Sequence, residues 1–129
     1  MDIALASRWT TVKWGRMHAR VGAQAPLHDR PVVLVHGLVI SSRYMVPTAV
    51  RLAPLCRIYA VDLPGYGLSE KPHTILGLTQ LANALAEWLD LERIPKSSFV
   101  ANSFGCQVLA EFACVIRIGS SDWFFRDQP

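Results

Sequence analysis

The sequence predicts an α/β fold with a mostly parallel sheet and an antiparallel hairpin at the N-terminus. Three observations predict this class: short continuously apolar runs, helical periodicity in the segments that follow them, and a regular alternation of the two. The chain has 129 residues, of which 51% are hydrophobic and 18% are charged. That length suits one domain, and that composition suits a packed core rather than a disordered segment.

The first predicted element is a hairpin of two outer strands. Residues 9–14 and 17–21 each alternate between apolar and polar side chains, and Gly15-Arg16 separates them. Such alternation is typical of strands with one solvated face. We therefore place the turn at Gly15-Arg16 and treat residues 22–30 as a polar connection to the rest of the sheet.

Three apolar segments predict strands that are buried on both faces, as in a parallel sheet. They are Pro31–Val35, Arg57–Val61 and Ser98–Ala101. Helices are predicted where apolar residues recur with helical spacing, over about 43–53, 78–91 and 104–113. Strand and helix thus alternate in the manner of βαβ units.

After Ala113 this pattern stops. We therefore divide the chain into residues 1–113, the structured part, and residues 114–129, a tail without clear periodicity. Truncation, or a change of reading frame near residue 114, is our interpretation of the tail. Without further strands beside it, the segment 98–101 is expected to form an exposed apolar edge.

Composition argues against several functional classes. The net charge of +3 comes with ten scattered arginines and no basic run, which disfavours a nucleic-acid partner. The apolar run over residues 31–40 is well short of the ~20 residues that a membrane span needs. Cys56, Cys106 and Cys114 show neither metal-ligand spacing nor an even count. We expect a cytoplasmic protein without a metal, a cofactor or a membrane partner.

The most informative stretch is Ala101-Asn102-Ser103-Phe104-Gly105. It fits the pattern G-x-S-x-G with alanine in the first glycine position, and it lies between a predicted strand and a predicted helix. A serine on such a sharp turn needs small residues two positions before and two positions after it, because they are pressed together. The alternative interpretation is an ordinary turn serine.

Two further motifs precede this stretch in a specific order. The strand Val33–Val35 ends in His36-Gly37, and the next strand ends in Asp62-Leu-Pro-Gly-Tyr-Gly-Leu-Ser69. Together with Asn102-Ser103-Phe104-Gly105, these motifs resemble the α/β-hydrolase superfamily over roughly residues 9–113. The resemblance implies a partial α/β-hydrolase fold in which residues 1–113 are the N-terminal part of the domain.

The resemblance also implies roles for individual residues. Ser103 matches the nucleophile, and the backbone N–H groups of Phe104 and Leu38 match the two oxyanion-hole donors. The resemblance assigns a structural role, supporting these groups, to His36, Gly37, Asp62, Ala101 and Gly105. Asn102 resembles the variant found among hydrolases that cleave carbon–carbon bonds in ring-fission products, although esterases are close to it in sequence.

The histidines decide how far the resemblance extends. In this fold the chain order is serine, then an acid, then histidine. Histidines occur only at positions 18, 28, 36 and 73, so none follows Ser103. His36 could be read as a base, but the resemblance favours a structural role. His18, His28 and His73 are interpreted as solvated loop or edge residues.

No carboxylate after Ser103 is assigned as the triad acid. Glu111 lies on a predicted helix, and Asp122 and Asp127 lie in the tail. Our first hypothesis is therefore a serine hydrolase, for esters or carbon–carbon bonds, that is truncated and inactive alone. An unstable pseudogene product ranks second, and a non-catalytic binding or interaction module ranks third. The substrate would be a small ester or ring-fission product, and the oligomeric state is left open.

Overall fold

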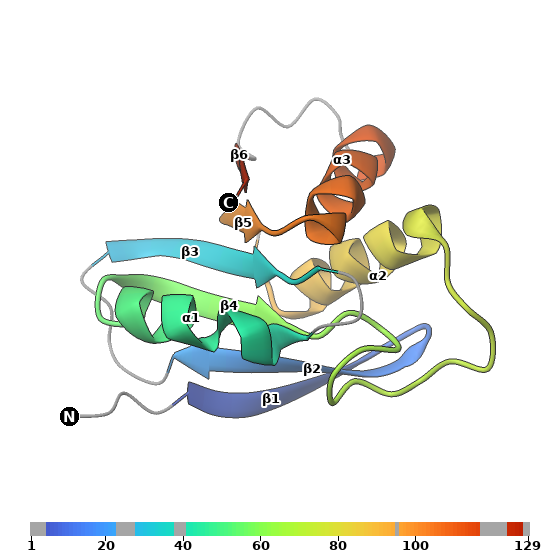
Figure 1. The fold of residues 1–129 in the computed structure, drawn as a ribbon, viewed down its shortest axis with the longest axis horizontal. Helices are drawn as coiled ribbons and strands as arrows, with labels where there is room; N and C mark the ends of the chain where they lie inside the picture. Colours follow the sequence, from blue (N-terminus) through green and yellow to red (C-terminus); the bar gives the residue numbers. More distant parts are fainter. Residues whose placement is uncertain (1–4, 23–27, 38–40, 95, 117–123, 128–129) are drawn as a thin grey trace.

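The fold is a six-stranded mixed sheet with helices on both faces, seen in a computed structural model (Figure 1). The structure describes residues 5–22, 28–37, 41–94, 96–116 and 124–127. The strand order is β1-β2-β4-β3-β5-β6. The predicted class, a mostly parallel sheet with an N-terminal antiparallel hairpin, is confirmed.

The hairpin consists of β1 (Leu5–Val12) and β2 (Gly15–Gly22), paired antiparallel. Val12 pairs with Gly15, so residues 13–14 form the turn, and the predicted turn at Gly15-Arg16 is wrong by two positions. Gly15 has a φ of 118°, a left-handed conformation that glycine accepts without strain. The shift matters because it places Trp9 directly opposite His18.

The parallel part of the sheet is formed by three strands whose central strand is β3. They are β3 (His28–Val35), β4 (Cys56–Val61) and β5 (Ser98–Ala101), and all three predicted buried strands are confirmed. Val33, Leu34 and Val35 are fully buried, as a strand covered on both faces requires. Because β3 is parallel to both neighbours, the three strands end at the same edge of the sheet.

A short sixth strand, β6 (Phe124–Asp127), pairs parallel with β5. The expectation that β5 would form an exposed edge is therefore wrong. Unlike β5, this strand has two aromatic residues followed by two charged ones, so neither a continuous apolar run nor an alternation marked it in the sequence. The strand falls within residues 114–129, and the division of the chain at residue 113 stays a prediction.

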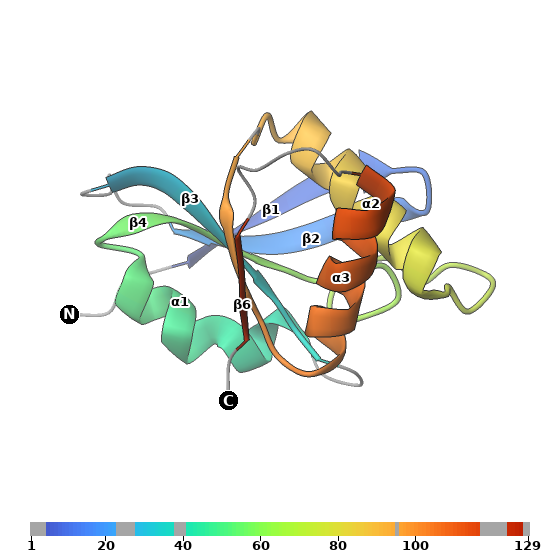
Figure 2. The ribbon, with the colours of Figure 1, turned by 90° about the horizontal axis from the view of Figure 1, so that it is seen from above.

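Two helical layers cover the sheet (Figure 2). On one face lie the 3₁₀ helix η1 (Ser42–Met45) and α1 (Val46–Leu52), which pack on Leu34, Ile58 and Ala60. On the other face lie α2 (Leu78–Leu91) and α3 (Phe104–Ile116). Trp88 of α2 is fully buried there and meets Tyr59 edge to face, with ring centroids 5.6 Å apart.

The helix limits follow from local chemistry. Ser41 caps η1, since its side chain accepts a hydrogen bond from the N–H of Arg43. Pro47 falls in the first turn of α1, where a missing N–H costs nothing. None of the described helices is both long enough and apolar enough to cross a bilayer.

Candidate active site

Ser103 occupies the sharp turn that joins β5 to α3 (Figure 1). Its φ is 53°, a left-handed conformation that a non-glycine residue adopts at a cost of about 1–3 kcal/mol. The side chain is exposed, whereas Ala101 before it is fully buried. The structure thus places a strained and accessible serine at the carboxyl end of a parallel strand.

Gly105 allows this turn to pack against β3. A Cβ atom on Gly105 would lie 2.5 Å from the carbonyl oxygen of Val35 and 2.8 Å from that of His36. The turn is held in place by the N–H of Asn102, which donates to Val35 O at 3.2 Å. The small residue predicted at position 105 therefore serves a backbone-to-backbone contact.

The N–H of Phe104 lies in the first turn of α3. Amide groups in a helix's first turn lack a partner inside the helix, and their dipoles favour a negative charge nearby. The other predicted donor, Leu38, lies outside the described residues. Its neighbour Gly37 is described and is buried.

His36 is fixed by backbone groups at both ring nitrogens. Nδ1–H donates to Gly37 O at 2.7 Å, and Nε2 accepts the N–H of Leu63 at 3.0 Å. An imidazole that accepts at one nitrogen must be neutral. Burial lowers the pKa of His36 below its ordinary value, outweighing the opposing effects of the Gly37 bond and the nearby Asp62 charge. The ring thus ties the end of β3 to the segment after β4.

Acidification is expected to destabilise the protein through His36. The folded protein keeps the ring neutral where the unfolded chain takes up a proton, starting near the ordinary value of 6.5. Stability should therefore fall as pH drops below about 6.5, by at most ~1.4 kcal/mol per pH unit from this group. Urea denaturation across this range measures the slope.

The control for this prediction is a pair of variants. His36→Gln removes the titrating ring and should flatten the slope, whereas His73→Gln, at an exposed position, should leave it in place. An identical slope in all three proteins would show that the proton binds elsewhere.

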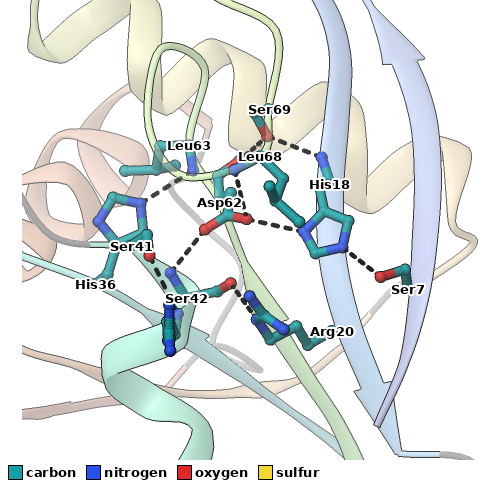
Figure 3. A network of polar contacts seen from close by, with 11 residues as sticks. Ser7, His18, Arg20, His36, Ser41, Ser42, Asp62, Leu63, Leu68 and Ser69 are labelled. Carbon is teal, nitrogen blue, oxygen red and sulfur yellow. Dashed lines mark hydrogen bonds and ion pairs between the residues drawn. The ribbon is translucent and has the colours of Figure 1, made fainter.

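Asp62 connects three segments from inside the fold (Figure 3). Its Oδ1 accepts the N–H of Ser42 at 2.6 Å, and its Oδ2 accepts the N–H of Leu68 at 3.2 Å and contacts His18 Nδ1 at 2.8 Å. The carboxylate is almost completely buried, with 1% of its side chain exposed. It holds the start of η1, the turn after β4 and the hairpin in one arrangement.

The turn from Asp62 to Ser69 is shaped around this carboxylate. A Cβ atom on Gly67 would lie 2.3 Å from Asp62 Oδ1, and the residue has a φ of 53°. Ser69 closes the turn, because its hydroxyl donates to Asp62 O at 2.6 Å and accepts the N–H of His18 at 2.8 Å. The motif D-x-P-G-x-G-x-S is thus a single hydrogen-bonded unit.

His18 corrects one interpretation of the sequence. It was expected at a solvated position, but it is fully buried and contacts Asp62 through Nδ1 and Ser7 Oγ through Nε2, both at 2.8 Å. The turn of residues 62–69 covers this face of β2, and a contact between segments 44 residues apart leaves no local signal. His73 is exposed as expected, and the side chain of His28 lies outside the described part.

Metal-ligating clusters and surface hollows are the other features that bear on the chemistry of the site. Within the described residues, no group of three or more His, Cys, Asp or Glu side chains could hold a metal ion. A hollow of about 400 Å³ lies over the segment after β4 and the start of α2. Its lining includes Tyr66, His73 and Leu81 and none of the residues of the turn at Ser103.

Comparison with known families agrees with this geometry. The model of the alpha/beta hydrolase family matches residues 32–126, which include the elbow and both preceding motifs. The chain belongs to this family.

Two curated relatives are similar over most of the chain. A 2-hydroxy-6-oxo-2,4-heptadienoate hydrolase from Pseudomonas putida is 34% identical over 77% of the chain and 39% of its own length. A pimeloyl-[acyl-carrier protein] methyl ester esterase from Xylella fastidiosa is 38% identical over 71% of the chain and 40% of its own length.

The solved structure of Cfl2 from Burkholderia cenocepacia superimposes with a TM-score of 0.79 at 29% identity. The match covers 87% of this chain and 37% of Cfl2. This hydrolase chain therefore spans about 40% of the length of these relatives.

Proposed function

We propose that Ser103 is the nucleophile of a serine-hydrolase site that cleaves an ester or a carbon–carbon bond in a small molecule. The observation that carries this proposal is the left-handed φ of 53° at Ser103, maintained by the close approach of Gly105 to β3. Strain of this kind persists where the surrounding structure enforces it, often at functional sites. The relatives include a hydrolase and an esterase, so both reaction types stay in the proposal.

The other site residues have supporting parts in this proposal. The N–H of Phe104, at the start of α3, donates to the oxyanion of a tetrahedral intermediate, and the N–H of Leu38 supplies the second donor. His36, Gly37 and Asp62 support the loop that carries Leu38. In this role His36 is not a base, since backbone groups occupy both of its ring nitrogens.

We also propose that the 129-residue chain does not turn over substrate by itself. Attack by a serine hydroxyl requires a base to take its proton, and that base requires an orienting acid. No histidine follows Ser103 in this sequence. A complete site would need both groups from additional chain. We also assign the protein to the cytoplasm, in keeping with three cysteines that form no disulfide in the described part of the chain.

A fluorophosphonate probe tests both parts of the proposal. Without an added base, we expect the Ser103 peptide to be labelled far below one equivalent. Free imidazole supplies the missing base from solution, so labelling of that peptide should rise with imidazole concentration. Mass spectrometry of the Ser103 peptide gives the readout, and Ser103→Ala is the control.

Two results would contradict the proposal. Stoichiometric labelling of Ser103 without imidazole would disprove the claim that the chain is inactive alone. If the extent of labelling of the Ser103 peptide does not rise with imidazole concentration, Ser103 is not a nucleophile that lacks only a base.

A further inference from the structure

A second serine has the partners that Ser103 lacks. Ser7 on β1 lies 2.8 Å from His18 Nε2, and His18 Nδ1 lies 2.8 Å from Asp62 Oδ2 (Figure 3). These three side chains come from β1, β2 and the segment after β4. A hydroxyl, an imidazole and a carboxylate in this order form the arrangement that activates a serine nucleophile.

The surrounding hydrogen bonds determine where the protons lie. Asp62 accepts the backbone N–H groups of Ser42 and Leu68, so its oxygens act as acceptors on an ionised carboxylate. The proton between Asp62 and His18 therefore belongs to Nδ1. With Nδ1 protonated, a neutral His18 presents its Nε2 lone pair to the hydroxyl of Ser7. This tautomer is the one in which an imidazole can act as a general base.

Accessibility also suits a reactive hydroxyl. Ser7 is exposed, whereas His18 is fully buried and Asp62 nearly so. The base is thus shielded from water while the hydroxyl can be reached from solvent. Trp9 lies against the His18 ring, with centroids 4.8 Å apart, and helps to fix its orientation.

Arg20 and Trp9 are neighbours of Ser7 on the same face of the hairpin. Arg20 is the direct cross-strand partner of Ser7, and paired residues in an antiparallel ladder share one face of the sheet. Its guanidinium is directed toward Ser42, because Nε donates to Ser42 Oγ at 3.0 Å (Figure 3). Trp9 is two residues along β1, on the same face, and is 42% exposed. The Arg16 guanidinium lies over the Trp9 ring, 4.4 Å from its centroid.

We propose that Ser7 is a second nucleophile, which accepts the acyl group of a small activated aryl ester. Oγ of Ser7 attacks the carbonyl carbon while its proton passes to His18 Nε2. The bond from the carbonyl carbon to the aryl oxygen then breaks, and the aryl oxygen takes the proton from His18. The products are an acylated Ser7 and a free phenol.

This chemistry is stoichiometric and independent of Ser103. In this proposal the acyl group is released by water slowly, so the reaction stops near one equivalent. General-base catalysis contributes about 10²–10⁴-fold to such a step, and that range is the advantage expected over an ordinary serine.

p-Nitrophenyl acetate is the probe, used on the full-length chain in a Ser103→Ala background. The expected result is a burst of p-nitrophenolate close to one equivalent, with the acetyl group found on the Ser7 peptide by mass spectrometry. Ser7→Ala should abolish the burst. Thr11→Ala is the matched control, because Thr11 is an exposed hydroxyl on the same strand and face but lies opposite Arg16.

His18→Asn separates reactivity from folding. Asparagine keeps an N–H donor near the position of Nδ1, facing Asp62, but has no group in place of Nε2. We expect this variant to keep the circular dichroism spectrum of the parent and to acylate Ser7 ~10²-fold more slowly. A burst that survives Ser7→Ala, or an unchanged rate in folded His18→Asn, would overturn the proposal.

Discussion

Replacing Asp62 with alanine is expected to destabilise the protein by about 3–5 kcal/mol. The carboxylate is 1% exposed and has hydrogen-bond partners in three separate segments, through Ser42, Leu68 and His18. Alanine would leave two backbone N–H groups and an imidazole without these partners. Each unpaired buried group costs about 1–3 kcal/mol, and relaxation of the turn recovers part of the sum.

Urea denaturation of the two proteins measures this loss. The matched control is Asp90→Ala, since Asp90 is an exposed aspartate on α2 and should change stability by less than ~0.5 kcal/mol. A domain of this kind is stable by about 5–15 kcal/mol, so the Asp62 variant should lose a large fraction of its stability. A loss below ~1 kcal/mol would show that the three segments are held together by other contacts.

The structure also predicts that the effect of Asp62 depends on His18. In a double-mutant cycle with His18→Asn, the two substitutions should fall short of additivity, because each removes part of the same network. Additive effects would show that the contact of Asp62 with His18 stabilises the fold independently of its hydrogen bonds to Ser42 and Leu68.

Gly105→Ala is the second large effect that we expect, at about 2–3 kcal/mol of destabilisation. The new Cβ would lie 2.5 Å and 2.8 Å from the carbonyl oxygens of Val35 and His36, which belong to the backbone. Neither oxygen can rotate away as a side chain could. Relief therefore requires α3 to move away from β3, which would shift the turn at Ser103.

The control for this prediction adds a Cβ where space is available. Gly77→Ser introduces one at the start of α2, where the nearest atom is Gln80 Oε1 at 3.9 Å, and serine is a favourable residue for a helix N-cap. Its effect on the free energy of unfolding should be close to zero. Equal stability of the two variants would contradict the close packing at Gly105.

The sequence predicted most of the fold because its elements have strong local signals. The strands around Val33, Ile58 and Phe99 are apolar on both faces, and the helix over residues 78–91 has a continuous apolar stripe whose limits match α2. Order along the chain then fixed the βαβ units. The hairpin turn was misplaced because alternation alone does not specify register, and a two-residue shift preserves the same pattern.

The candidate site was predictable only in part. The small residues at 101 and 105 report the sharp turn at Ser103 directly, because the backbone there excludes larger side chains. No comparable feature of the neighbouring residues indicated that His18 is buried. Whether a histidine on a strand is exposed depends on what covers that face, and the covering turn begins 44 residues later in the sequence.

The sequence by itself determined the family, the order of the strands and helices up to α3, and the serine on the turn after β5. These features rest on residue size and periodicity, which act between near neighbours. Only the tertiary structure decided the partners of Asp62, the neutral state of His36 and the meeting of Ser7 with His18. Hydrogen bonds between segments that are far apart in the sequence depend on how the sheet and its connecting turns pack in space. The pattern of residues along the chain does not show which of these segments come into contact.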